Sequence, residues 1–286
     1  MPTNYERTKD VLDALVAIAS STHGGSVDAL VKSSLDALSN AYPGLMSSTR
    51  APIDYSSIEV QIAYAFRCLA AHGDLLHRTL IGCNSHVLSR LTGESIKVAC
   101  VGGGPGSDAL GFVKFAERQG LTAKPVEFVF LDREPAWQTV RSALFPTFGT
   151  FPASSRFVQT DLATGSPWTS DWSFIDADLF TFSFALSEVW AFDGSGSVSN
   201  FLNFVISGAK SGAMFAYTDN GGPSFLPLAE KIFEARADLT RVFTADDTWM
   251  LIGGDEQQSA INGYITRFGQ ESKKTGNVNR RLWAKV

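Results

Sequence analysis

The sequence predicts an α/β fold: a doubly wound, mostly parallel, seven-stranded sheet with a helical N-terminal region. Three observations lead to this prediction. Residues 1–94 carry apolar residues at helical spacing and contain no strand-like run. From Lys97 onward, short apolar runs alternate with segments long enough for a helix, which is typical of βαβ units. The first of these runs enters a glycine-rich loop. We therefore divide the chain into residues 1–94 and residues 95–286.

Composition limits the classes of function. The chain has 286 residues, 44% of them hydrophobic and 19% charged, so it can bury a large core. Its net charge of −5 provides no broad basic field, which disfavours nucleic acid and anionic membranes as partners. Three irregularly spaced cysteines favour a reducing compartment over a disulfide framework. With a polar start and no bilayer-length apolar run, we expect a cytoplasmic protein, with the nucleus as the alternative.

The N-terminal region is predicted to fold as helices that cover residues 11–19, 27–38 and 85–91, with another beginning near residue 56. For that helix, Ser56-Ser-Ile-Glu59 has the form of a capping box, and an apolar stripe follows it. The stripe consists of Ile58, Ile62, Ala65, Phe66 and Leu69.

The second part of the chain supplies the strands and the helices between them. Strands are expected at Val98–Val101, Val126–Leu131, Arg156–Val158, Asp178–Phe184, Ala213–Tyr217, Thr248–Ile252 and Arg281–Lys285. Helices are expected at Ala109–Gln119, Ser197–Ala209 and Ser224–Ala235. A polar stretch between the last two strands, which holds Gly253-Gly254 and Gly263, is a candidate substrate loop.

The residues that follow the first three strands carry the most specific signal. The first strand runs into Lys97-Val-Ala-Cys-Val-Gly-Gly-Gly-Pro-Gly-Ser-Asp108, the second ends in Val-Phe-Leu-Asp132, and the third leads to Asp161-Leu162. Glycines let a ligand approach the backbone closely, and a carboxylate can accept two hydroxyl hydrogens. In order and spacing, residues 97–286 resemble the class I S-adenosylmethionine-dependent methyltransferases, whose sheet is Rossmann-like.

The resemblance implies a catalytic domain over residues 95–286 that uses S-adenosyl-L-methionine, with residues 1–94 as its cap or lid. It places four glycines under the methionine part of the cofactor: Gly102, Gly103, Gly104 and Gly106. It assigns Asp132, with Arg133 beside it, to the ribose hydroxyls. It assigns Asp161 to the adenine amino group and the backbone amide of Leu162 to the adenine ring.

One position departs from the family pattern. Members commonly carry an acid two residues before the first glycine, where this chain has Cys100. A cysteine on a buried strand packs as a small hydrophobe and cannot neutralise the ammonium group of the cofactor. Asp108, in the first turn of the following helix, is the candidate replacement for that acid.

The fourth strand delivers the reacting group in this family, so Ser187, Glu188 and Trp190 are the candidate catalytic residues. Alternatively, Glu188 caps or solvates a helix start and Trp190 belongs to the core. The missing Asn-Pro-Pro-Tyr signature removes the usual support for base methylation in nucleic acid. We expect a nitrogen or oxygen acceptor on a small molecule or a protein side chain. Asp219 and Asn220 are secondary candidates for substrate contact, or else form an Asp/Asn-Gly turn.

The predicted lid carries Tyr55, Tyr64, Arg67 and His72. Arg67 either pairs with the cofactor carboxylate or faces solvent on its helix. Phe184 and Trp190 are either core residues or a wall for a cationic substrate. The four histidines lack metal-ligand spacing, so no metal site is predicted.

Two other functions remain open. An NAD(P)-dependent oxidoreductase is suggested by Gly104-x-Gly106-x-x-Ala109, which fits the dinucleotide fingerprint. Against it, the carboxylate of Asp108 in the first helical turn would repel a pyrophosphate but attract a sulfonium and an ammonium. The second alternative is a non-catalytic subunit that binds the cofactor as a partner of another protein, which Cys100 favours.

Overall fold

The computed structural model describes residues 1–286 except residues 46, 48, 50, 222–224 and 252–255. The helices of the N-terminal region are α1 (Asn4–His23), α2 (Val27–Ala41), α3 (Ile58–Tyr64), α4 (Ala70–Gly82) and α5 (Asn84–Arg90). A π-helical turn, Ala65–Leu69, joins α3 to α4. The later helices are α6 (Ser107–Arg118), α7 (Gln138–Leu144), α8 (Ala185–Val189), α9 (Ser197–Gly208), α10 (Leu226–Phe233) and α11 (Asn262–Phe268).

The strands form one seven-stranded sheet in the order β3-β2-β1-β4-β5-β7-β6. Their bounds are β1 (Ile96–Val101), β2 (Val126–Asp132), β3 (Ala153–Gln159), β4 (Leu179–Ser183), β5 (Met214–Asn220), β6 (Leu239–Met250) and β7 (Thr275–Lys285). Strands β1 to β5 run parallel, whereas β7 pairs antiparallel with both β5 and β6. The chain order reverses between β1 and β4, where a parallel sheet of this kind binds its ligand.

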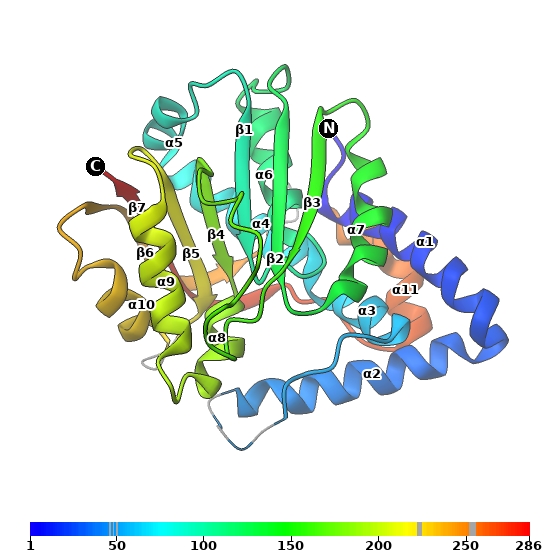
Figure 1. Cartoon of the computed structure of the whole chain (residues 1–286). Helices are drawn as coiled ribbons and strands as arrows, with labels where there is room; N and C mark the ends of the chain where they lie inside the picture. The colour runs from blue at the N-terminus through cyan, green and yellow to red at the C-terminus, as the bar shows by residue number, and fades with distance from the viewer. Residues whose placement is uncertain (46, 48, 50, 222–224, 252–255) are drawn as a thin grey trace.

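Helices cover both faces of the sheet (Figure 1). One face packs against α4, α6, α7 and the other N-terminal helices, and its core includes Val98, Cys100, Phe128 and Phe130. The other face packs against α9 and α10. Successive residues of β1 and β2 alternate between the two cores because side chains of a strand point to opposite faces. Mainly apolar side chains cover both faces of the central strands, which explains the continuous hydrophobic runs of these strands.

The N-terminal helices are part of this layered structure. Helix α4 lies directly on α6, and the two backbones meet at Gly73 and Gly111, where an added Cβ at Gly111 would overlap the carbonyl of Gly73. Helix α2 and the chain after it extend past the carboxyl ends of the strands (Figure 1). None of the described helices has the length and apolar content to cross a bilayer. The division at residue 94 stays a prediction.

Most of the expected elements are confirmed with small shifts of their ends. Two differ for physical reasons. Strand β6 begins at Leu239, nine residues before the expected start, because it is an edge strand whose side chains are mostly exposed and polar. Strand β4 ends at Ser183 instead of continuing through Phe184, which adopts a left-handed conformation. Residues Ser224 and Ile252, at the ends of two expected elements, lie outside the described residues.

Two smaller expectations also need correction. The residue before α3 is Ser57, and its side chain makes no capping hydrogen bond, so the predicted capping box at Ser56–Glu59 is wrong. A capping box forms instead at Thr3 and Glu6, at the start of α1. In the expected substrate loop, Gly253 and Gly254 lie outside the described residues, whereas Gly263 belongs to α11.

A buried ion network joins the N-terminal region to the rest of the fold. The ammonium of Lys114 on α6 donates to Asp74 Oδ1 on α4, at 2.9 Å, and to Glu256 Oε1, at 2.6 Å. The second oxygen of Glu256 accepts from the backbone N–H of Tyr5 on α1. All three charged side chains are at least 94% buried, so each charge depends on its partners for solvation.

We predict that Lys114→Met lowers the free energy of unfolding by about 3–5 kcal/mol, because it leaves the buried carboxylate of Glu256 without its counter-charge and removes one of the two cations that pair with Asp74. The control is Lys9→Met, since Lys9 forms a half-exposed pair with Asp13 and should cost less than about 1 kcal/mol. Urea unfolding followed by circular dichroism measures both. Equal midpoints for the two variants would show that the network does not join the two regions energetically.

Candidate functional site

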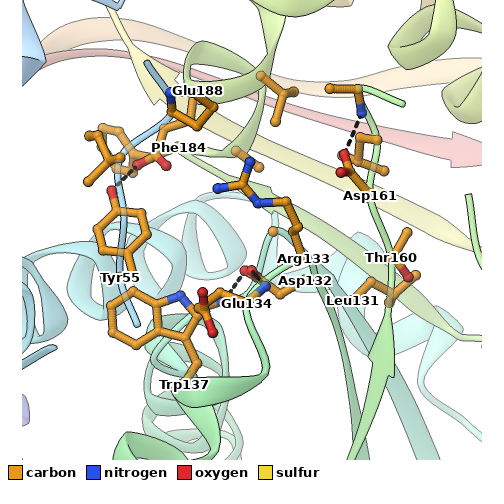
Figure 2. Close-up of a pocket in the computed structure, with 18 of the residues that line it drawn as sticks. Tyr55, Leu131, Asp132, Arg133, Glu134, Trp137, Thr160, Asp161, Phe184 and Glu188 are labelled. Carbon is orange, nitrogen blue, oxygen red and sulfur yellow. Dashed lines mark hydrogen bonds between the residues drawn. The ribbon is translucent and has the colours of Figure 1, made fainter. Parts of the chain in front are cut away.

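A cleft opens at the carboxyl ends of β1, β2, β3 and β4 (Figure 2). Its floor is the glycine loop after β1, and its sides come from residues 131–134 after β2 and residues 160–163 after β3. The side of the cleft next to β4 is formed by residues 183–185 and by Glu188 on α8. Lid residues, among them Tyr55 and Tyr64, complete it. The cleft lies at the reversal of strand order, as the fold requires.

The glycine loop is held tightly at its centre. The backbone N–H of Gly104 donates to Asp132 Oδ2 at 3.0 Å, and its carbonyl accepts from Arg141 Nη1 at 2.7 Å. At Gly103 no side chain fits, because an added Cβ would lie 2.7 Å from the Cβ of Cys100. The Arg141 side chain lies 5.0 Å from the ring of Phe130, and burial lowers its pKa to about 10, so it stays charged at neutral pH.

Asp132 stands at the end of β2 and faces the cleft (Figure 2). Its second oxygen, Oδ1, accepts from the backbone N–H of Glu134 at 2.9 Å. Burial raises the pKa of Asp132, and the two backbone N–H donors oppose that rise. Each carboxylate oxygen keeps a lone pair, so the group is oriented but still able to accept two hydroxyl hydrogens. Arg133 follows it, and its side chain extends into the cleft.

The third strand contributes Asp161 and Leu162, which both line the cleft. Asp161 Oδ1 accepts from the backbone N–H of Ala163 at 3.0 Å, which closes a turn and holds the carboxylate at the rim. Leu162 is buried, and its carbonyl accepts from Ser197 Oγ at 2.7 Å. The sequence therefore predicted three strand ends that the fold does bring to one cleft.

The wall beside Asp132 is aromatic. Trp137 is only 2% exposed and contacts Tyr55, with ring centroids 4.9 Å apart, and Tyr64, with centroids 5.3 Å apart. A flat apolar ligand can stack on such a wall. Sequence reasoning missed Trp137, although it follows Asp132 by five residues and is preceded by a proline that begins a short 3₁₀ turn (Pro135–Trp137).

Asp108 lies behind the cleft, close to Cys100. Both residues are buried, and Asp108 Oδ2 accepts from Thr181 Oγ1 on β4 at 2.8 Å. Its other oxygen, Oδ1, is buried without a well-oriented hydrogen bond from the described residues. Burial raises the pKa of Asp108 to about 6, with the hydroxyls of Ser183 and Thr181 partly offsetting the rise. Ser183, whose hydroxyl favours the charged form of Asp108, itself lines the cleft.

The turn after β4 sets the far side of the cleft. Phe184 has φ +58°, and among the described residues it is the one residue other than glycine with a positive φ. That conformation costs about 1–2 kcal/mol. It is held because the backbone N–H of Phe184 donates to the carbonyl of Thr218 at 2.8 Å. Such strain is typical of functional sites.

The three candidate catalytic residues on α8 and after it have different surroundings. Glu188 lines the cleft, and its Oε1 accepts from the hydroxyl of Tyr55 at 3.1 Å (Figure 2). Ser187 is fully buried and lines a second cavity beside the cleft. Trp190 lines neither and packs against the core of the opposite sheet face. Their catalytic role stays a prediction.

Most of the remaining residues that the sequence suggested for cofactor or substrate contact line the second cavity. Arg67, His72 and Asn220 line it. Asp219 lies behind them, fully buried, and its Oδ2 accepts from the backbone N–H of Ser187 at 2.9 Å. Burial raises the pKa of Asp219 to about 6. Asp219 therefore positions α8, while Asn220 reaches the cavity.

Two further residues of the site gave no signal in the sequence. Arg141 lies on α7 and reaches the glycine loop only through tertiary packing. Lys273 lies in a polar stretch, next to another lysine, yet lines the second cavity. Neither belongs to a motif, because both come from segments distant from the strand ends.

The topology decides which fold this is. A dinucleotide-binding sheet has the order 3-2-1-4-5-6 with parallel strands. Here an antiparallel β7 is inserted between β5 and β6. The sheet therefore has the seven-stranded, mostly parallel, Rossmann-like form that the sequence predicts, and its order differs from that of a dinucleotide-binding sheet.

Several solved structures of methyltransferases are similar to this chain at low sequence identity. No family model and no curated protein matches the chain. Among solved methyltransferase structures, the precorrin-6y C5,15-methyltransferase from Geobacter metallireducens is 10% identical, with a TM-score of 0.41 over 71% of this chain and 88% of that one. The ribosomal protein L11 methylase from Lactobacillus delbrueckii is 12% identical, with a TM-score of 0.41 over 73% and 79%. The plantazolicin methyltransferase BpumL in complex with SAH is 10% identical, with a TM-score of 0.40 over 98% and 96%.

The raised pKa of Asp108 predicts a specific pH dependence of stability. Between pH 3.8 and about 6, the unfolded chain releases the Asp108 proton before the folded chain does. The folded state therefore loses stability as pH rises through this range, by up to about 3 kcal/mol, and the loss persists at neutral pH. Asp108→Asn should remove this loss and raise the free energy of unfolding at pH 7.

Urea unfolding at pH values from 4 to 8 measures the difference between the wild type and Asp108→Asn, which isolates this residue from Asp219. Asp10→Asn is the matched control, because Asp10 is exposed on α1. A constant difference between the wild type and Asp108→Asn across the range would contradict the prediction.

Proposed function

We propose that the protein is a methyltransferase that uses S-adenosyl-L-methionine and acts on a nitrogen or oxygen nucleophile of a small molecule or a protein side chain. One observation carries the proposal. The glycine loop, Asp132 and Asp161 follow three neighbouring strands and line a single cleft at the carboxyl ends of a mostly parallel sheet. A nucleoside can bind there with its sugar at Asp132 and its base near Asp161 and Trp137.

The residues present fit this cofactor. The glycine loop has no room for side chains at Gly103, so its backbone is free for close approach. The unsatisfied Oδ1 of Asp108 supplies a buried negative charge on the glycine-loop side, where a positively charged ligand is favoured. This charge takes the place of the acid that Cys100 replaces. Cys100 itself is fully buried, and burial raises its pKa, so it stays a neutral thiol.

The bound cofactor would supply a methyl group on a positively charged sulfur, already activated for displacement. The protein then has three tasks. The glycine loop, whose backbone is held by Asp132 and Arg141, orients the ligand. The aromatic lid residues Tyr55 and Tyr64 exclude water. The turn at Phe184 brings the acceptor in line with the methyl group. Glu188 stands at this turn, with a carboxylate able to take a proton from a nitrogen or hydroxyl acceptor.

The alternatives have less support. The inserted antiparallel β7 and the buried Asp108 both speak against a dinucleotide, because a pyrophosphate at this helix N-terminus would meet a carboxylate. A non-catalytic partner subunit would need no acceptor site. A second cavity adjoins the cleft, which favours an enzyme.

We predict that Asp132→Asn weakens binding of S-adenosylmethionine by about 10- to 100-fold, since hydrogen bonds to a charged group contribute roughly 1.5–3 kcal/mol. The amide keeps one acceptor oxygen and the size of the side chain. Calorimetric titration with S-adenosylmethionine and S-adenosylhomocysteine measures the change. Asp176→Asn is the control, because Asp176 lies on the surface and pairs with Lys97.

Titration of the wild type with NADPH tests the alternative directly. Binding of NADPH with no heat from either S-adenosyl ligand would overturn the proposal.

Transfer itself is tested by incubating the protein with labelled S-adenosylmethionine and a cell extract, followed by mass identification of the labelled product. We expect label in a small molecule or a protein, and Glu188→Gln to lower the rate. Label in RNA or DNA would contradict the proposed acceptor class. Cofactor binding without labelled product would favour the non-catalytic subunit.

A further inference from the structure

The second cavity, with a volume of about 380 Å³, is large enough for a small molecule. It adjoins the cleft, since Tyr64, Phe184 and Glu188 line both. Aromatic rings form much of its described wall, because Tyr42 and Phe225 join Tyr64 and Phe184. A ligand in this cavity would therefore lie against aromatic rings and next to the cleft at the turn after β4.

Lys273 is a cationic side chain in this wall that forms no ion pair with the residues that the structure describes. The Lys273 ammonium lies 4.4 Å from the centroid of the Phe184 ring and 3.5 Å from His72 Nε2. Within the described part of the chain, no carboxylate lies within ion-pair distance of it. Burial lowers the pKa of Lys273, and the carboxylate of Asp219, which lies beyond ion-pair distance, opposes only part of this lowering. A partly buried cation of this kind is stabilised when an anion binds beside it.

The fold holds Lys273 in place through its backbone. Its N–H donates to the carbonyl of Arg67 at 2.9 Å. Arg67 belongs to the π-helical turn, in which the normal helical hydrogen bonds are shifted, so this carbonyl is open to a partner outside the helix. Turns of this kind occur frequently at functional sites. The segment before β7 is thereby fixed against the N-terminal region with Lys273 at the cavity.

His72 orients the lysine side chain. Its ring stacks on Phe184 with centroids 3.8 Å apart and an interplanar angle of 12°. Burial, together with the charge of Lys273, keeps the pKa of His72 well below its usual value, so the imidazole is neutral. A neutral imidazole can accept a hydrogen bond from the ammonium through Nε2. Lys273 is therefore positioned without its charge being cancelled.

We propose that this cavity binds the methyl acceptor, a small aromatic molecule with an anionic oxygen, and that Lys273 holds this oxygen. The proposal deepens the proposed methyltransferase function and rests on it. It narrows the acceptor atom from nitrogen or oxygen to oxygen, as a carboxylate or a phenolate. Lys273 acts as a specificity-determining residue, since the ammonium selects the charge of the acceptor.

The transfer step balances without a proton acceptor because the oxygen is already anionic, and Glu188 acts as a base only where a phenol must first lose its proton. The anionic oxygen forms a bond to the methyl carbon while the bond from that carbon to sulfur breaks. The electron pair of the broken bond stays on sulfur, which becomes a neutral thioether. The acceptor becomes a neutral methyl ester or aryl methyl ether. The product loses its attraction to Lys273 when its charge is removed, which favours release.

The test measures binding of matched probes to the protein saturated with S-adenosylhomocysteine. The probes are benzoate and 4-nitrophenolate as anions, benzamide as the neutral molecule and benzylammonium as the cation. Ligand-observed NMR titration gives their affinities without requiring turnover. We expect both anions to bind at least about 10-fold more tightly than benzamide, since the contact is a charge-assisted hydrogen bond.

Variants then assign the preference to Lys273. Lys273→Met should abolish the preference for anions over benzamide, and Lys273→Arg should restore part of it. Lys274→Met is the matched control, because the adjacent Lys274 is exposed and pairs with Glu271. Unchanged affinity for S-adenosylhomocysteine in all three variants shows that they fold.

Equal binding of benzoate and benzamide by the wild type, an anion preference that survives in Lys273→Met, or tighter binding of benzylammonium would each overturn the inference. Labelled methyl found on nitrogen would overturn it too. These outcomes leave the methyltransferase proposal standing, whereas failure to bind either S-adenosyl ligand would remove that proposal first.

Discussion

The site depends on the backbone of Gly104, which is held from both sides by charged groups. Asp132 accepts its N–H and Arg141 donates to its carbonyl, so the loop after β1 is tied to the end of β2 and to α7. Hydrogen bonds to charged groups contribute roughly 1.5–3 kcal/mol each, and leaving either partner unpaired would cost a similar amount. The same carboxylate that fixes the loop also faces the cleft. Loop geometry and ligand recognition are therefore coupled through one side chain.

The strained and irregular parts of the backbone lie around the second cavity. The left-handed Phe184 ends β4, and the π-helical turn interrupts the path from α3 to α4. The two irregularities meet, because the ring of Phe184 stacks on His72 at the start of α4 and lies against Lys273. Regular structure at either position would place these groups elsewhere. The surrounding core, which is almost entirely apolar, is what can sustain such local costs.

The charged groups inside the protein fall into two kinds: those that pair with one another and those that lack an ion-pair partner. Lys114, Asp74 and Glu256 compensate one another and connect the N-terminal region to the fold. Asp108 is a buried carboxylate and Lys273 a partly buried ammonium, and neither forms an ion pair with the residues that the structure describes. One lies behind the glycine loop and the other in the second cavity. Taking a charged group out of water costs stability when no opposite charge pairs with it. A bound ligand of opposite charge would supply the missing partner.

The sequence alone determined the strands, their alternation with helices and the three strand ends that meet at the cleft. These follow from local pattern, since apolar runs, glycines and terminal acids are read over a few residues. The weakly patterned β6 was placed too late, because an exposed edge strand lacks the alternation that burial imposes. Tertiary structure decided the rest: Trp137 against Tyr55, Arg141 on the glycine loop and Lys273 beside His72. Lys273 and His72 are 201 residues apart, and no local pattern encodes a contact that arises only when the sheet closes against the N-terminal helices.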